Sequence, residues 1–206
     1  MMQLTTLAAL ILGQIAVPGL SGQPTEIEFQ LPAERVIVYP GSGELRMLTN
    51  VTMSREAQEA FDQNFRSATY FSAFAYAKGG GWGYVTTTNS LDSARSIAMG
   101  ECLTSNDNCR LVAEIVPAGY RDLQPGDITM APEVAELYRN PASVGATNNV
   151  AMAISEDGAY AMSWGYQSLA ESEAQAMQDC IANLNQDQPG VPEMPCTLLP
   201  GVPQPQ

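Results

Sequence analysis

The chain has 206 residues, which is enough for one domain or two small ones. Apolar residues make up 45% and charged residues 15%, so the chain can build a core and lacks the composition of a disordered protein. The net charge of -13 makes nucleic acid and anionic lipid poor partners. The absence of histidine excludes His-based triads and most zinc and haem ligand sets, and we expect no metal and no cofactor.

The N-terminal segment is apolar. Residues 4–20 carry no charge, and small residues follow around Ser21 and Gly22. This pattern is typical of a signal peptide, although no Lys or Arg precedes it, and we predict one over residues 1–22. The alternatives are a buried helix and an uncleaved anchor, and only the anchor would hold the protein at a membrane. We therefore expect a periplasmic or secreted protein.

Four cysteines, Cys102, Cys109, Cys180 and Cys196, support export. Four cysteines allow three pairings. The two local pairs are the simplest, because each would tie the end of a helix to the strand that follows it. A four-thiolate zinc site is the alternative, but it usually carries C-x-x-C pairs, which do not occur in this sequence.

The chain repeats itself. Residues 72–102 align with residues 150–180 at an offset of 180 − 102 = 78 without a gap, and residues 51–61 align with 128–138 at an offset of 77. The identical pairs in the first alignment are Ala73/Ala151, Ala75/Ala153, Gly80/Gly158, Ser90/Ser168, Leu91/Leu169, Ala98/Ala176, Met99/Met177 and Cys102/Cys180. The period exceeds that of common solenoid repeats. We predict two related units, 23–117 and 118–199, and a loose tail over 200–206.

The expected elements have the same order in each unit: a strand, a helix, a β-hairpin and a second helix that ends at a cysteine. In the first unit they are Arg35–Tyr39, a helix capped by Ser54, the hairpin strands Ser72–Ala77 and Trp82–Thr88, and Leu91–Leu103. In the second unit they are Leu111–Val116, a helix starting at Pro132, the hairpin strands Val150–Ser155 and Tyr160–Tyr166, and Leu169–Ile181.

Helix starts and the closing strand complete this pattern. Ser90 and Ser168 are expected N-caps of the second helices, and Cys196–Leu199 is expected to close the second unit as a strand. The predicted fold class is therefore α+β. It is a tandem duplication of a strand–helix–β-hairpin–helix unit with an antiparallel sheet, one disulfide per unit and a closing C-terminal strand.

The two faces of each hairpin differ in side-chain size, because residues alternate between the faces of a strand. The bulky face carries Phe74, Tyr76, Trp82 and Tyr84 in the first unit, and Met152, Ile154, Tyr160, Met162, Trp164 and Tyr166 in the second. The opposite face is mostly alanine and is expected to receive Ala94 and Ala98 of one helix, and Ala170 and Ala174 of the other. The bulky face can meet the other unit, the first helix of its own unit, or a ligand.

The run Gly81-Trp82-Gly83-Tyr84, with Ser90, Ala94, Ala98, Cys102 and Cys109 after it, resembles an uncharacterised family of small secreted bacterial domains. The pattern recurs from Gly158 to Cys196. The resemblance implies a hairpin–helix–strand unit with one disulfide and no known activity. Similar chains are sometimes labelled aminolevulinate synthase, but that chemistry needs pyridoxal phosphate on a lysine in a large fold. The only lysine here, Lys78, lies in a glycine-rich turn.

Candidate site residues fall into two sets. Trp82, Tyr84, Trp164 and Tyr166 are candidates for ligand binding by ring stacking, and a packed core is the alternative. Glu56 and Glu133 are weak catalytic candidates, since Glu59 and Glu136 follow each at helical spacing, and a solvated helix face is the alternative.

These observations favour a non-enzymatic binding or envelope-interaction module. Its partner would be an unknown envelope component or a small ligand. The alternative function is a carboxylate-dependent hydrolase acting on an envelope glycan.

Overall fold

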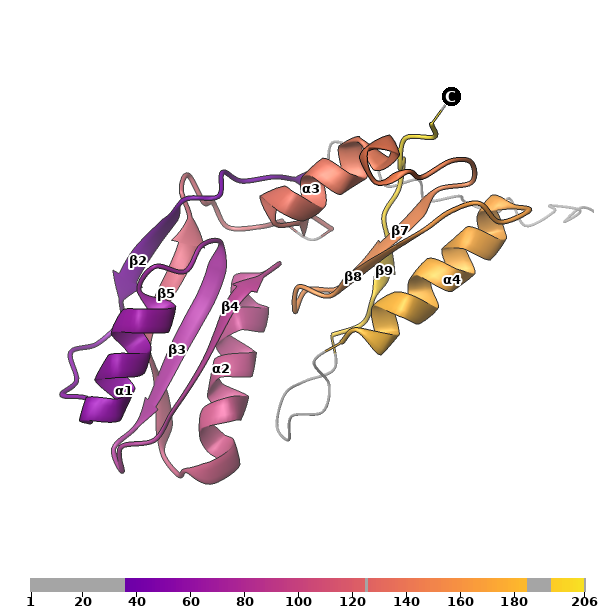
Figure 1. The fold of residues 1–206 in the computed structure, drawn as a ribbon. Helices are drawn as coiled ribbons and strands as arrows, with labels where there is room; N and C mark the ends of the chain where they lie inside the picture. The colour runs from indigo at the N-terminus through magenta and orange to yellow at the C-terminus, as the bar shows by residue number, and fades with distance from the viewer. Residues whose placement is uncertain (1–35, 125, 185–193, 206) are drawn as a thin grey trace, which may run out of the picture. The chain divides into compact units, whose positions relative to one another are not determined.

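The computed structural model describes residues 36–124, 126–184 and 194–205, and the predicted signal peptide lies outside them. The chain is a mixed α+β protein with antiparallel sheets (Figure 1). Its strands are β1 (Val36–Ile37), β2 (Gly43–Met47), β3 (Phe71–Ala77), β4 (Trp82–Thr88), β5 (Cys109–Pro117), β6 (Ile128–Thr129), β7 (Ala151–Ile154), β8 (Tyr160–Ser163) and β9 (Thr197–Leu198). Its helices are α1 (Arg55–Ala60), the π-helix η2 (Phe61–Phe65), α2 (Leu91–Ser105), α3 (Pro132–Arg139), the 3-10 helix η3 (Pro141–Val144) and α4 (Leu169–Ala182). None of the helices in the described ranges combines the length and the apolar character that a membrane span requires.

The first sheet has the strand order β2-β5-β3-β4, and α1 and α2 cover its opposite faces (Figure 1). On the α2 face, Ala73 and Ala75 of β3 are fully buried with Ala94 and Ala98 of the helix, as predicted. The small side chains let the helix approach so closely that a Cβ atom on Gly83 would lie 2.4 Å from the backbone nitrogen of Cys102. The alanine face therefore sets the distance between this helix and the sheet.

The opposite face of the first sheet is covered by its own first helical segment, which was one of the three predicted partners. Phe61 and Phe65 of η2 pack on Phe74 of β3 with ring centroids 5.2 and 5.4 Å apart. Tyr76 closes this cluster and accepts a hydrogen bond from the backbone N–H of Ser54 at 2.9 Å. The result is an aromatic core between α1, η2 and the sheet.

The second sheet has the order β8-β7-β9, and its alanine face packs against α4. The predicted helix contacts Ala170 and Ala174 are wrong, because both residues are exposed. The buried stripe of α4 is Ser172, Ala176 and Cys180. A helix buries residues spaced by four on one side, and the stripe that leads to the disulfide-bonded cysteine excludes the two alanines.

The predicted helix starts and local disulfides are confirmed. The hydroxyls of Ser54, Ser90 and Ser168 each accept a hydrogen bond from a backbone N–H three residues later, and Pro132 opens α3. Disulfides join Cys102 to Cys109 and Cys180 to Cys196. Each ties a helix to the strand that follows it, β5 or β9.

Three features differ from the sequence-based expectations. The two predicted opening strands, Arg35–Tyr39 and Leu111–Val116, occupy different positions. The first is only the short strand β1, which pairs in parallel with β6, whereas the second lies inside β5, between β2 and β3 of the first sheet. Strand β2 was not predicted; it pairs with β5 along its whole length. The C-terminal segment, expected to be loose, is held where the Gln204 side chain makes two hydrogen bonds of 2.8 Å with the backbone of Val150.

Candidate functional site

The predicted binding residues Trp82 and Tyr84 lie in β4, at the edge of the first sheet, and both are half-buried. The ring of Tyr84 stacks on Phe74 with centroids 5.9 Å apart and an interplanar angle of 13°. Trp82 packs against the same aromatic core. Much of the surface of these two rings is thus used in packing.

The other two predicted binding residues, Trp164 and Tyr166, follow the end of β8. Gly165 between them adopts a φ of +80°, which turns the chain out of the strand. Tyr166 is 40% exposed, and its carbonyl accepts a hydrogen bond from the Asn149 side chain at 2.8 Å. None of the four predicted aromatic residues lines the two hollows described below.

The weak catalytic candidates Glu56 and Glu133 occupy the first turns of α1 and α3, and both are exposed. The Glu56 carboxylate lies 3.7 Å from Nε of Arg55, in a pair that solvent screens on both sides. A general acid or base needs an environment that tunes its proton affinity. The surroundings of these two side chains therefore give the hydrolase hypothesis no geometric support.

A hollow of about 310 Å³ lies where α2 begins, beside β2 and β5. We call it the charged hollow. It is lined by Arg46, Ser90, Leu91, Asp92, Arg95, Glu114, Tyr120, Asp122 and Leu123.

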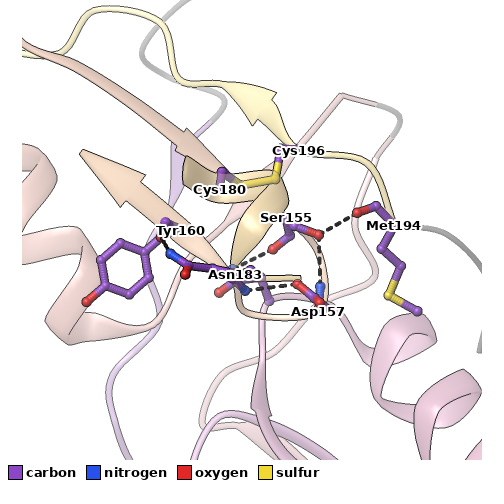
Figure 2. Close-up of a disulfide and its surroundings, with 9 residues drawn as sticks. Ser155, Asp157, Tyr160, Cys180, Asn183, Met194 and Cys196 are labelled. Carbon is purple, nitrogen blue, oxygen red and sulfur yellow. Dashed lines mark hydrogen bonds between the residues drawn. A yellow bond between two sulfur atoms is a disulfide. The ribbon is translucent and has the colours of Figure 1, made fainter. Parts of the chain in front are cut away.

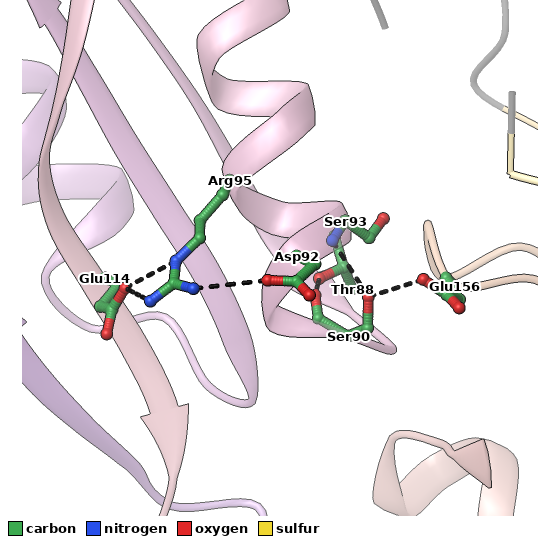
Figure 3. Close-up of polar contacts among 7 residues, drawn as sticks. All are labelled: Thr88, Ser90, Asp92, Ser93, Arg95, Glu114 and Glu156. Carbon is green, nitrogen blue, oxygen red and sulfur yellow. Dashed lines mark hydrogen bonds and ion pairs between the residues drawn. The ribbon is translucent and has the colours of Figure 1, made fainter. Parts of the chain in front are cut away.

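The register of the sheet and the cap of α2 bring these residues together. Arg46 of β2 is the cross-strand partner of Glu114 in β5. Ser90 caps α2 by accepting a hydrogen bond from the backbone N–H of Ser93 at 3.0 Å, and Asp92 lies in the first turn of the helix. Arg95 then lies one turn into the helix, between Glu114 and Asp92 (Figure 3).

Glu114 is the buried charge of the site, with a side chain that is only 5% exposed. Nε and one terminal nitrogen of Arg95 donate to the same Glu114 oxygen at 3.1 and 2.7 Å, and the other terminal nitrogen lies 3.4 Å from Asp92 (Figure 3). Burial alone would lower the pKa of Arg95, but the two carboxylates raise it above its ordinary value. A buried carboxylate is tolerated only when it is paired in this way.

Tyr120 forms the aromatic wall of the charged hollow. Its ring packs on Phe71 at 5.3 Å and on Tyr39 at 6.1 Å, so it is anchored in the core. The Arg46 guanidinium carbon lies 5.8 Å from the Tyr120 ring centroid, within cation–π range. Burial, and after it the negative charges of Asp122 and Asp92, raise the pKa of Tyr120.

Within the parts of the chain that the structure describes, the Arg46 guanidinium makes no hydrogen bond and no ion pair. Glu114, its cross-strand neighbour, is bound by Arg95 instead. Arg46 is therefore positioned by the Tyr120 ring, while its N–H groups remain available to a ligand. A guanidinium held in this way suits a carboxylate or a phosphate, which it can bind through two hydrogen bonds.

A smaller hollow of about 150 Å³ adjoins the charged hollow and shares Ser90 and Leu123 with it. Here the Asn89 side chain donates to the carbonyl of Ser155 at 2.8 Å. The Ser90 hydroxyl donates to Glu156 at 3.0 Å, as Figure 3 shows. The Glu156 carboxylate thus occupies the N-terminal end of α2, where the helix dipole favours negative charge.

The turn that carries Glu156 is itself fixed from the second sheet. The Ser155 hydroxyl donates to the carbonyl of Met194 at 2.8 Å, close to the Cys180–Cys196 disulfide (Figure 2). Asp157 accepts a hydrogen bond from the backbone N–H of Ala159 at 2.9 Å, which tightens the same turn. Side-chain hydrogen bonds therefore fix the turn that lines the smaller hollow with Ser155 and Glu156.

Comparison of the chain with protein-family models, with curated proteins and with solved structures found no match. The evidence for the candidate site is therefore its geometry. Sequence reasoning did not single out Arg46, Glu114 or Tyr120. One available signal was Glu114, a charged residue inside the apolar run 111–116, because a carboxylate in a buried strand requires a cationic partner.

Proposed function

We propose that this protein is an exported, non-enzymatic binding module that takes a small polar ligand from the cell envelope into the charged hollow. One observation carries the proposal. The Arg46 guanidinium is held over Tyr120 with no ion pair to any described residue, next to the Arg95–Glu114 pair, whose carboxylate is buried. Rigid neighbours and an exposed guanidinium that the described residues leave without an ion pair together form a pre-organised anion-binding position.

Export is supported by the two disulfides, because such bonds persist in the periplasm and outside the cell and are rare in the cytosol. The apolar segment within residues 1–22, predicted to be a signal peptide, points to the same compartment. The resemblance to small secreted bacterial domains agrees with this location.

We also propose that the chain arose by duplication of one unit, with 23–117 and 118–199 as the two copies. Several backbone features recur at the 78-residue offset. The glycines in the hairpin turns, Gly80 and Gly158, have φ of +101° and +103°. The strand order β5-β3-β4 in the first sheet has its counterpart β9-β7-β8 in the second. The buried residues of α4, Ser172, Ala176 and Cys180, lie 78 residues after Ala94, Ala98 and Cys102, which are buried in α2.

The binding function is tested with soluble peptidoglycan fragments as the probe. We expect the oxidised, exported protein to show saturable NMR shifts at the side-chain N–H groups of Arg46 and Arg95 during the titration. Arg46→Gln should weaken binding by about tenfold or more, as expected for a lost charge-assisted hydrogen bond.

Arg110→Gln is the matched control, because Arg110 is an exposed arginine on β5 of the same sheet. Its affinity should equal that of the wild type. Shifts confined to other surfaces, or equal affinity for both variants, would refute the proposed binding site.

A further inference from the structure

The charges that line the charged hollow do not cancel. Arg95 is engaged by Glu114, and this pair is internally neutral. One guanidinium, that of Arg46, and two carboxylates, those of Asp92 and Asp122, remain around the hollow. The Asp92 side chain is 91% exposed, so water weakens its 3.4 Å contact with Arg95 and leaves much of its charge available.

These remaining charges are separated within the hollow. The Arg46 guanidinium lies over the face of the ring. Asp92 lies on the other side of Arg95 from Glu114, the cross-strand partner of Arg46, and Asp122 lines the hollow with it (Figure 3). The hollow therefore has a positive end at Arg46, over the Tyr120 ring, and a negative end at Asp92 and Asp122.

This separation discriminates between classes of ligand. A simple anion would be attracted by Arg46 but repelled by the two carboxylates, and a simple cation would meet the opposite conflict. The N-terminus of α2 offers an anion no second position, because the Ser90 hydroxyl caps it and the Glu156 carboxylate binds that hydroxyl. A ligand that carries both charges satisfies both ends.

Resting on the proposed binding function, we infer that the ligand is a zwitterion, an amino acid or a short peptide with a free ammonium and a free carboxylate. The ligand carboxylate pairs with Arg46, and its ammonium lies between Asp122 and Asp92. The carbon chain between them contacts Leu91 and Leu123, which supply the apolar part of the lining. A hollow of about 310 Å³ has the size of a site for a small molecule of this kind.

The inference is tested by calorimetric titration of the oxidised protein with alanine, dialanine and trialanine. The N-acetylated and the C-amidated form of each of the three compounds is titrated in the same way, and NMR spectra of the protein are recorded with every compound. We expect at least one free compound to bind saturably and to shift the Arg46 and Arg95 resonances. Either modification should weaken its binding by about tenfold or more, because each removes one charged contact.

Two variants assign each end of the ligand to its partner. Arg46→Gln should abolish the difference between the free and the amidated compound and preserve the effect of acetylation. Asp122→Asn combined with Asp92→Asn should do the reverse. Arg110→Gln and Asp107→Asn, which change exposed charges outside the charged hollow, should match the wild type.

The outcomes separate this inference from the function on which it rests. Binding in the hollow that is insensitive to acetylation and amidation would overturn the zwitterion and keep the binding module. Peptidoglycan fragments that shift the hollow while all the alanine compounds fail would do the same. Absence of shifts at the hollow with every compound, fragments included, would refute both.

Discussion

Replacing Gly83 by alanine tests whether the alanine face sets the position of α2. A Cβ atom at this position would lie 2.4 Å from the backbone nitrogen of Cys102, 2.6 Å from the Ala98 carbonyl oxygen and 2.7 Å from the Glu101 Cβ. Two of these three atoms are backbone, so no flexible side chain can swing away. The helix must retreat by roughly 1 Å to restore ordinary contact distances near 3.5 Å. The disulfide at Cys102, which ties the helix end to β5, opposes that retreat.

Overpacking of this kind costs about 1–3 kcal/mol, and we expect Gly83→Ala to lie at the upper end, about 3 kcal/mol. For a chain of this length the melting temperature should fall by about 6–12 °C. Chemical denaturation of the oxidised protein measures the change, with an unchanged denaturant slope as evidence that both end states are the same. Gly79→Ala in the same hairpin is the matched control, since nothing lies within 4 Å of a Cβ atom there. If the unfolding free energies of Gly83→Ala and Gly79→Ala differ by less than about 0.5 kcal/mol, α2 does not approach β4 as closely as described.

Three further predictions concern buried polar groups and cross-links. Arg95→Leu should lower the unfolding free energy by about 3 kcal/mol, because it leaves the Glu114 carboxylate buried and unpaired. In the same denaturation assay, adding Glu114→Leu should restore part of this loss. Additive effects of the two substitutions on the unfolding free energy would contradict the pairing. Among the described residues, the buried Tyr70 hydroxyl has no hydrogen-bond partner with ordinary geometry, and the nearby Thr129 side chain and backbone of Tyr39 and Met130 offset only part of its burial, so Tyr70→Phe should stabilise the fold by about 1 kcal/mol or less. Burial also raises the pKa of Tyr70, so above about pH 10 the unfolded chain loses this proton first and stability falls as the pH rises; Tyr70→Phe should lessen that fall, and an identical alkaline profile would refute the assignment. Removing Cys102–Cys109 and Cys180–Cys196 by paired alanine substitutions should cost about 2.4 and about 3.1 kcal/mol, because the bridges close loops of 7 and 16 residues; the opposite order would show that strain or residual structure dominates.

The elements that the sequence predicted well are those with a local cause. Ser90 and Ser168 cap their helices because a serine hydroxyl can satisfy a free N–H in the first turn wherever the chain begins a helix. The hairpins follow from alternating side chains around glycine turns, and Gly80 and Gly158 do adopt the left-handed conformations that such turns need. The local disulfides follow from helices that reach a cysteine just before a strand.

The elements that the sequence missed depend on distant contacts. Strand β2 is short and mostly exposed, so no alternation of apolar residues marks it, and only its pairing with β5 makes it a strand. The π-helical turn after α1 places Phe61 and Phe65 against Phe74, which is a tertiary requirement. The charged hollow was missed for the same reason. It joins Arg46, Glu114 and Tyr120, which come together only once β2 has paired and the chain after β5 has folded back.

Under the proposed duplication, Arg46, Arg95 and Glu114 of the charged hollow belong to the first copy, while Tyr120, Asp122 and Leu123 come from the start of the second. At the 78-residue offset, Glu173 stands in place of Arg95, so the second copy carries the opposite charge on its helix. Glu114 lies five residues after Cys109, and the fifth residue after Cys196 is Gly201, beyond the end of β9. Among the residues that the structure describes, the second sheet, with the order β8-β7-β9, also has no strand in the place of β2 to carry a second arginine. The second copy instead supplies Glu156, which binds the cap of α2. This asymmetry is expected when one copy of a duplicated unit keeps a binding site and the other supports it.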